Sequence, residues 1–175
     1  MKSLIFLIGM PGTGKTTIGK RLAKSLQYSF VDLDERIVNN YHTSINSIFI
    51  EKGERFFRRI ENITLLRLIT DIDTPTIISC GGGTPAFLNN LNIMKHNGIV
   101  IHLSANVETL FKRLQRSDRP MFNNHSNKDE FCQQVIQLLH QRTYYYQQAD
   151  FSYPTDRISN QTILALQELI QGKLE

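Results

Sequence analysis

Residues 4–16 read LIFLIGMPGTGKT, an apolar run that leads directly into a glycine-rich turn and a lysine–threonine pair. Leu4–Ile8 is apolar without interruption, which is typical of a strand buried on both faces of a sheet. From Lys15 to Leu26, apolar residues recur at helical spacing with lysine and arginine between them. A strand, a glycine-rich turn and a helix in this order begin a parallel βαβ unit, so this stretch predicts an α/β fold.

The alternation of strands and helices continues along the rest of the chain. Short apolar runs predict four further strands at residues 30–33, 77–79, 99–103 and 151–153. Helical spacing predicts helices at residues 45–52, 54–69, 107–115, 131–146 and 162–170. The expected fold is therefore a three-layer α/β fold, with a five-stranded parallel sheet and helices on both faces.

Two stretches interrupt the simple alternation. Residues 35–70 hold two helices instead of one between the second and third predicted strands, and residues 114–128 are polar and rich in Asn and Asp. Insertions at the carboxyl ends of parallel strands are where α/β proteins place ligand contacts. We therefore expect a substrate-binding insertion at 35–70 and a lid at 114–128, within one domain that spans all 175 residues.

The composition excludes several classes of protein. The formal net charge is +4, but lysine and arginine are dispersed, so a pocket for anionic ligands is a better explanation than nucleic-acid binding. Cys80 and Cys132 form no CxxC pair and the five histidines show no ligand spacing, which argues against a disulfide framework or a zinc site. No stretch has the length of a signal peptide's apolar region or of a membrane span. We expect a cytoplasmic monomer that binds neither membrane nor nucleic acid.

The glycine-rich turn at residues 9–16 fits the phosphate-binding pattern G-x-x-x-x-G-K-[ST], the P-loop. Its backbone N–H groups can surround phosphate oxygens, and the N-terminus of the following helix adds a favourable partial charge. Lys15 would reach the β- and γ-phosphates, and the Thr16 hydroxyl would hold Mg²⁺. The alternative is a turn that merely joins strand to helix. The residues expected to bind a nucleotide here are Gly12, Thr13, Gly14, Lys15, Thr16 and Thr17.

Two carboxylates, Asp32 and Asp34, follow the second predicted strand. A phosphotransfer site needs one carboxylate near the metal and another to orient or deprotonate the accepting hydroxyl. The alternative is that one or both cap a helix that begins near Glu35. Because a phosphate loop is expected on a neighbouring strand, the catalytic interpretation is favoured.

Arginines and glycines further along could hold a second substrate. Most arginines on helices are solvated, which is the expectation for Arg55 and Arg59, beside Arg58 on the same predicted helix. Three glycines at residues 81–83 allow close approach of a ligand to the backbone, although a tight turn is the alternative. Arg119 lies in the expected lid, and a lid arginine can close onto the transferring phosphoryl group.

Three adjacent tyrosines, residues 144–146, follow Arg142 on the predicted late helix. Three consecutive residues of a helix cannot share one face. At least one tyrosine is therefore expected in the core and at least one on the surface.

Six motifs occur in order along the chain: GMPGTGKTT at 9–17, D-x-D at 32–34, SINSIFIEKGERFFRRIE at 44–61, GGG at 81–83, Arg119-Pro120 and the Arg142 segment. In these motifs the chain resembles the shikimate kinase family over nearly its whole length. The phosphate loop alone is shared by many enzymes. The combination of G-E-x-x-F-R-x-x-E, GGG and R-P is much more specific. This chain departs from the family pattern at two places. Thr84-Pro85 stands where the family usually has a small apolar pair, and Tyr144 stands where it usually has a proline.

The resemblance implies transfer of the ATP γ-phosphoryl group to the 3-hydroxyl of shikimate with Mg²⁺. It implies that Asp34 binds the shikimate hydroxyls and accepts the proton, and that Thr16 and Asp32 hold Mg²⁺. Lys15 and Arg119 would stabilise charge on the transferred group. In the family pattern both arginines of the substrate site bind the carboxylate of shikimate, and Glu61 orients Arg58. The residue that stacks on adenine would be Arg113, or else Lys112 or Arg116. The implied substrate residues are Asp34, Arg58, Gly81, Gly82, Gly83 and Arg142.

Two other functions fit the same sequence features less well. One is another small P-loop kinase, acting on gluconate or a nucleoside monophosphate. The other is a regulatory or nucleic-acid-binding NTPase, for which the net charge of +4 is the only support.

Overall fold

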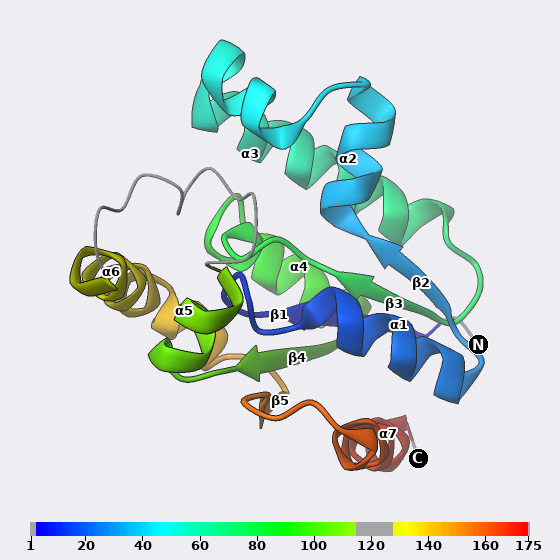
Figure 1. Ribbon diagram of the computed structural model, residues 1–175. Coiled ribbons are helices and arrows are strands. Elements are labelled where there is room, and N and C mark those ends of the chain that lie inside the picture. Colours follow the sequence, from blue (N-terminus) through cyan, green and yellow to red (C-terminus); the bar gives the residue numbers. More distant parts are fainter. Residues whose placement is uncertain (1–2, 115–127, 175) are drawn as a thin grey trace.

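The computed structural model describes residues 3–114 and 128–174, and a five-stranded sheet forms its centre (Figure 1). The strands are β1 (Leu4–Ile8), β2 (Ser29–Asp32), β3 (Thr76–Ser79), β4 (Gly98–Ser104) and β5 (Phe151–Pro154). Their order in the sheet is β2-β3-β1-β4-β5, and every pair of neighbours is parallel. The predicted α/β fold class is confirmed.

Seven α-helices connect or follow these strands in the described ranges. They are α1 (Lys15–Leu26), α2 (Leu33–Tyr41), α3 (Ile45–Asp71), α4 (Asn90–Asn97), α5 (Val107–Leu114), α6 (Lys128–Tyr146) and α7 (Asn160–Leu174), with a short 3₁₀ helix, η1, at Thr84–Ala86. Helices α2 and α3 pack side by side and project from the side of the sheet on which β2 lies (Figure 1). Among the helices described, none combines the length and apolar character needed to cross a membrane.

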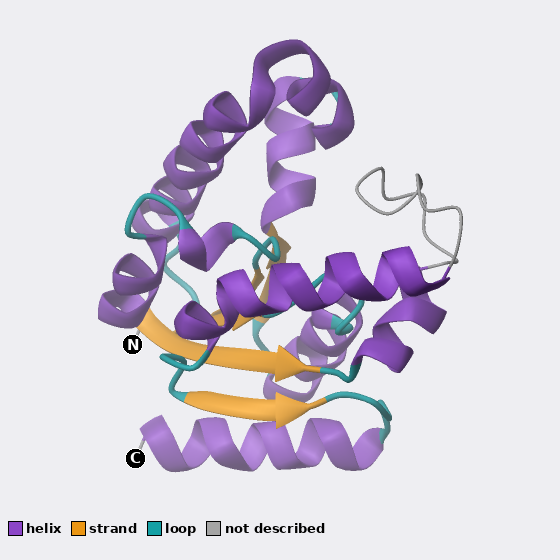
Figure 2. Ribbon diagram, turned by 90° about the vertical axis from the view of Figure 1, so that its left-hand side faces the viewer, coloured by secondary structure: helices purple, strands orange, loops and turns teal. Residues whose placement is uncertain are grey.

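The central strand β1 contributes to a separate core on each face of the sheet. Leu4, Phe6 and Ile8 pack with residues of α2 to α6, whereas Ile5 and Leu7 pack with α1 and α7. This alternation follows from the two-residue period of a strand, and it explains why the run is apolar throughout. Each fully buried side chain of this kind stabilises the fold by about 1.5–3 kcal/mol. Figure 2 shows that α7, the helix at the C-terminus, lies along the strands of the sheet.

The connection between β2 and β3 differs from the prediction in its boundaries. Helix α2 precedes the two predicted helices, and its range was not among those predicted. The predicted helices 45–52 and 54–69 together form α3, and the predicted break between them is present as a kink at Gly53. Gly53 has φ 78° and ψ 169°, angles that break the helical path without ending the helix. Strand β2 ends one residue early because the Asp32 side chain accepts the N–H of Asp34 and starts α2.

Helix α4 was not predicted from the sequence. Its eight residues, NLNIMKHN, include three asparagines, which have low helix propensity and hide the apolar spacing. Burial of Leu91 and Met94 in the core accounts for the helix instead.

The tyrosine prediction is confirmed. Tyr146 is 2% exposed and belongs to the core, whereas Tyr144 is 70% exposed. The structure therefore places Tyr146 in the core, Tyr144 on the surface and Tyr145 partly buried against the same core.

Candidate active site

A pocket of about 450 Å³ lies beyond the carboxyl ends of three neighbouring strands, β1, β2 and β3. Ligands of parallel α/β proteins bind at this edge because side chains from several loops meet there. The lining residues are Gly12, Gly14, Lys15, Thr16, Thr17, Asp32, Asp34, Glu35, Ser79, Cys80, Gly81, Gly82, Arg113 and Leu114. The sequence predicted most of these, but not Glu35, Ser79, Cys80 or Leu114.

The glycine-rich turn between β1 and α1 adopts backbone angles that favour glycine. Gly12 has φ 87°, and Gly14, the N-cap of α1, has φ 88°. This path brings the N-terminus of α1 to the pocket, where its N–H groups and dipole favour an anion. Thr13 does not line the pocket; its hydroxyl donates to the Met10 carbonyl oxygen at 2.9 Å and holds the shape of the loop.

The ammonium group of Lys15 lies within the loop. Its Nζ donates to the carbonyl oxygens of Gly9 at 2.8 Å and Met10 at 3.0 Å. The loop carbonyls thus hold a positive charge at the edge of the pocket, next to the N-terminus of α1. Both features favour a phosphate group at this position.

Asp32 uses its two carboxylate oxygens for two different purposes. Oδ2 accepts the Thr16 hydroxyl at 2.8 Å, while Oδ1 accepts the N–H groups of Asp34 at 3.0 Å and Glu35 at 3.4 Å. Helix capping and a place beside the phosphate loop, which were alternatives for this residue, therefore occur together.

The adjacent oxygens of Thr16 and Asp32 fit a magnesium ion, which prefers oxygen ligands and keeps several water molecules or phosphate oxygens. Within residues 3–114 and 128–174, no group of three or more His, Cys, Asp or Glu side chains could hold a metal by itself.

Cys80 lines the pocket but is not suited to act as a nucleophile. Burial raises the pKa of its thiol well above 9.0, and the negative charge of Glu61 raises it further. The thiol stays protonated at neutral pH, and only the thiolate is a strong nucleophile.

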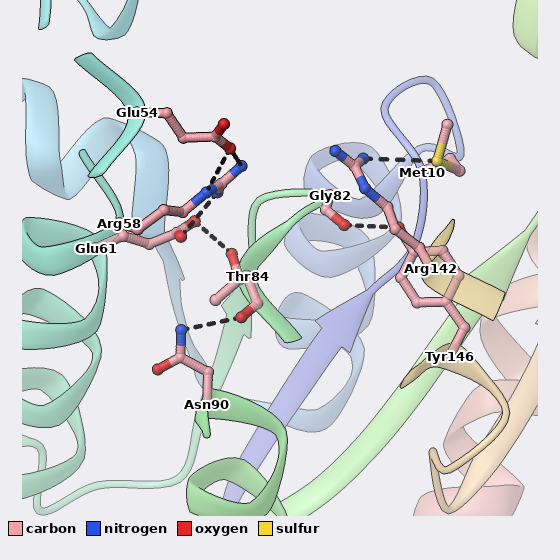
Figure 3. A network of polar contacts seen from close by, with 9 residues as sticks. All are labelled: Met10, Glu54, Arg58, Glu61, Gly82, Thr84, Asn90, Arg142 and Tyr146. Atoms are coloured by element: carbon pink, nitrogen blue, oxygen red, sulfur yellow. Dashed lines mark hydrogen bonds and ion pairs between the residues drawn. The ribbon is translucent and has the colours of Figure 1, made fainter. Parts of the chain in front are cut away.

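The three glycines after β3 lie between two buried arginines, Arg58 of α3 and Arg142 of α6 (Figure 3). A Cβ atom on Gly83 would lie 2.6 Å from Arg58 Nη2, and one on Gly82 would lie 2.7 Å from Pro11 Cδ and 3.1 Å from Arg142 Nη1. Neither glycine has a positive φ. Glycine therefore suits position 83 because the Arg58 guanidinium approaches closely, and position 82 because the Pro11 ring and Arg142 do, rather than because of turn geometry.

Both arginines are only 7% exposed, which is unusual for this residue type. The Arg58 guanidinium donates to Glu61 Oε2 at 2.9 Å and to Glu54 Oε1 at 3.1 Å, and it stacks on the Phe87 ring with 4.3 Å to the centroid. In the described part of the chain, Arg142 forms no ion pair. A buried cation beside Gly82, at the pocket wall, suits an anionic ligand.

A family model for shikimate kinase matches residues 11–171 of this chain. The chain belongs to the shikimate kinase family. A shikimate kinase of Azobacteroides pseudotrichonymphae genomovar. CFP2 is 42% identical over 151 residues, which cover 85% of this chain and 88% of that protein.

Solved structures of shikimate kinases agree closely in fold. The 1.7 Å crystal structure of shikimate kinase from Bacteroides thetaiotaomicron has a TM-score of 0.91 at 33% identity, covering 97% of this chain and 98% of that chain. Shikimate kinase from Acinetobacter baumannii, in complex with shikimate, has a TM-score of 0.88 at 29% identity, covering 100% of this chain and 97% of that chain.

The arginine expected at the adenine of a shikimate kinase has a clear position here. Arg113 lines the pocket and donates to the carbonyl oxygens of Gly12 at 3.0 Å and Thr155 at 2.6 Å. Lys112 instead points to solvent, with 71% of its side chain exposed and an ion pair to Glu108 at 2.8 Å. Of these two candidates, Arg113 lines the pocket and Lys112 faces solvent, while Arg116, Arg119 and most of the expected lid (114–128) lie outside the described residues.

Tyr146 is a residue of the site that sequence reasoning missed. Its hydroxyl donates to the Gly82 carbonyl oxygen at 2.6 Å, and its ring stacks on His102 with 4.7 Å between centroids. Burial raises the pKa of Tyr146 to about 12, so the hydroxyl remains a donor at neutral pH. The tyrosine triplet indicated that one ring is buried, but not which one or against which loop.

Proposed function

We propose that this chain transfers the γ-phosphoryl group of ATP to the 3-hydroxyl of shikimate, giving shikimate 3-phosphate and ADP. Membership of the shikimate kinase family supports the reaction class, and the relative bound to shikimate supports the acceptor. The observation that carries the proposal is the pair of buried arginines on either side of the glycine loop, beside a phosphate loop. Shikimate offers the carboxylate that such a pair would bind.

The nucleotide would bind with its phosphates at the N-terminus of α1. Lys15 would exchange the Gly9 and Met10 carbonyls for the β- and γ-phosphate oxygens. Thr16 and Asp32 would hold Mg²⁺, which neutralises charge on the phosphates when bound. Arg113 would lie at the adenine end of the pocket.

The acceptor would bind between the glycine loop and the first turn of α2. Asp34 lines the pocket, and its Oδ1 lies 3.2 Å from where a Cβ atom of Gly81 would be. This carboxylate would orient the accepting hydroxyl and take its proton as the oxygen attacks the γ-phosphorus and ADP leaves. Arg58 and Arg142 would hold the carboxylate of the acceptor, so that the ring could not turn the hydroxyl away from the phosphate.

A coupled assay of ADP release tests this function. ATP and Mg²⁺ are supplied with shikimate, gluconate, a nucleoside monophosphate or no acceptor, and the product is identified by mass. We expect release only with shikimate, together with a shikimate phosphate. Release that ignores shikimate would contradict the proposal, and release with one of the other acceptors would support the corresponding alternative kinase.

A further inference from the structure

Glu61 is a fully buried carboxylate with a different partner on each oxygen (Figure 3). Oε2 accepts from Arg58 Nη1 at 2.9 Å, and Oε1 accepts from the Thr84 hydroxyl at 2.6 Å. A buried carboxylate is costly unless its oxygens are hydrogen-bonded, and a hydroxyl at this distance makes a strong, charge-assisted bond. Thr84 therefore fixes the orientation of the group that orients Arg58.

Thr84 is itself held in place from two directions. It is the first residue of η1, directly after the three glycines, and its N–H donates to the Gly81 carbonyl oxygen at 3.2 Å. Its own carbonyl oxygen accepts from Asn90 Nδ2 at 2.9 Å, and Asn90 Oδ1 accepts from Asn62 Nδ2 at 2.8 Å. Because Asn62 follows Glu61 on α3, these bonds tie η1 and α4 back to the same turn of α3 that carries Glu61.

The space around this contact is closed. A Cβ atom on Gly81 would lie 3.0 Å from Glu61 Oε1 and 3.0 Å from the Thr84 hydroxyl oxygen. Thr84 is 0% exposed. Since the contact is tightly packed, loss of the hydroxyl would leave Oε1 without an equivalent donor.

We infer that Thr84 is a positioning residue for the acceptor: through Glu61, its hydroxyl holds the Arg58 guanidinium in the plane that meets the carboxylate of shikimate. The inference rests on the proposed function. A fork of two N–H donors binds a carboxylate well only in a fixed plane, so rotation of Glu61 would weaken acceptor binding. An apolar residue at position 84 could not donate this bond.

The test replaces Thr84 with valine, which keeps the shape and removes the donor, and with serine, which keeps the donor. We expect Thr84→Val to raise the shikimate KM about tenfold and leave the ATP KM within about twofold. Thr84→Ser should stay near the wild type. Thr64→Val is the matched control: Thr64 of α3 is buried like Thr84, but among the described residues its hydroxyl bonds the Ile60 carbonyl oxygen, at 2.7 Å, and not Glu61. Thr84→Ala serves the same purpose if the valine variant does not fold.

A double-mutant cycle with Arg58→Lys separates positioning from general structural damage. If Thr84 acts through Arg58, Thr84→Val should change the shikimate KM of the Arg58→Lys enzyme by less than about twofold. Equal increases in the shikimate KM and the ATP KM of Thr84→Val would overturn the inference about Thr84, and so would a shikimate KM like that of the wild type. Either result would leave the proposed function standing. A wild-type protein without shikimate-dependent turnover would instead overturn the proposed function, and this inference with it.

Discussion

Arg58 and Arg59 are neighbours on α3 but have opposite environments. The Arg58 side chain is 8% exposed and paired with two carboxylates, whereas Arg59 is exposed, as its sequence context predicted. Successive residues of a helix point about 100° apart, so one faces the glycine loop and the other faces solvent. The two residues are of the same chemical type, so residue type alone could not show which of them is buried. Their different environments follow from the directions in which the two side chains leave α3.

This pair allows a matched test of acceptor binding. Arg58→Lys keeps the charge but removes the planar fork, so we expect the shikimate KM to rise at least about tenfold with little change in the ATP KM. Arg59→Lys should leave both constants unchanged. Steady-state kinetics with each substrate varied would decide; equal effects of the two substitutions would mean that Arg58 does not contact the acceptor.

At the scale of elements, the kink in α3 separates the tip of the helix from the part that carries the site. Gly53 interrupts the helical angles, yet Phe49 before it and Phe57 after it pack together, with 4.6 Å between ring centroids. The kink therefore folds the first turns of α3 onto the turn that positions Arg58.

The kink predicts opposite effects for two glycines that have equal space around them. A Cβ atom on either Gly53 or Gly172 would meet no atom within 4 Å, but only Gly53 has a positive φ, 78°. We expect Gly53→Ala to lower the free energy of unfolding by about 1–3 kcal/mol, because its backbone angles are nearly exclusive to glycine. Gly172→Ala in α7 should raise it by up to about 1 kcal/mol. Urea titrations compare them; a neutral Gly53→Ala would show that the kink is not strained for other residues.

At the scale of the whole molecule, one sheet divides the interior into two cores, and a partly buried histidine of β4 packs beside Tyr146 at the edge of one of them. His102 of β4 lies under Tyr146, and burial, followed by the charge of Lys15, lowers its pKa from 6.5 to about 4. The ring is therefore neutral in the folded protein at neutral pH.

The lowered pKa predicts a loss of stability in acid. Below pH 6.5 the unfolded chain protonates His102 first, so the free energy of unfolding falls as the pH drops towards 4. His102→Phe keeps a ring against Tyr146, and between pH 7 and 4.5 it should lose on the order of 2 kcal/mol less stability than the wild type. His140→Gln, at an exposed position of α6, is the control. Identical pH dependence of His102→Phe and the wild type, measured by urea unfolding, would contradict the assignment.

The sequence by itself determined the features that depend on local order along the chain. An uninterrupted apolar strand, a glycine-rich turn and a helix specify the phosphate loop, because the loop depends on neighbouring residues. The alternation of strands and helices along the chain in turn indicates a parallel sheet. The same holds for Asp32 and Asp34, at the end of β2 and the start of α2. The expectation that β2 neighbours the strand before the loop was wrong, because β3 lies between them, but Asp32 still reaches the loop through Thr16. The roles of the site residues stay predictions until the variants are measured.

Only the tertiary structure decided which residues of similar type meet. Helix α4 forms because Leu91 and Met94 find a core, Tyr146 and not Tyr144 is buried, and Thr84 meets Glu61 across 23 positions of sequence. No local pattern carries this information, since burial and hydrogen-bond partners depend on how distant elements pack. The physical reason is that a side chain's environment is set by its three-dimensional neighbours, whereas periodicity records only the direction in which it leaves its own helix or strand.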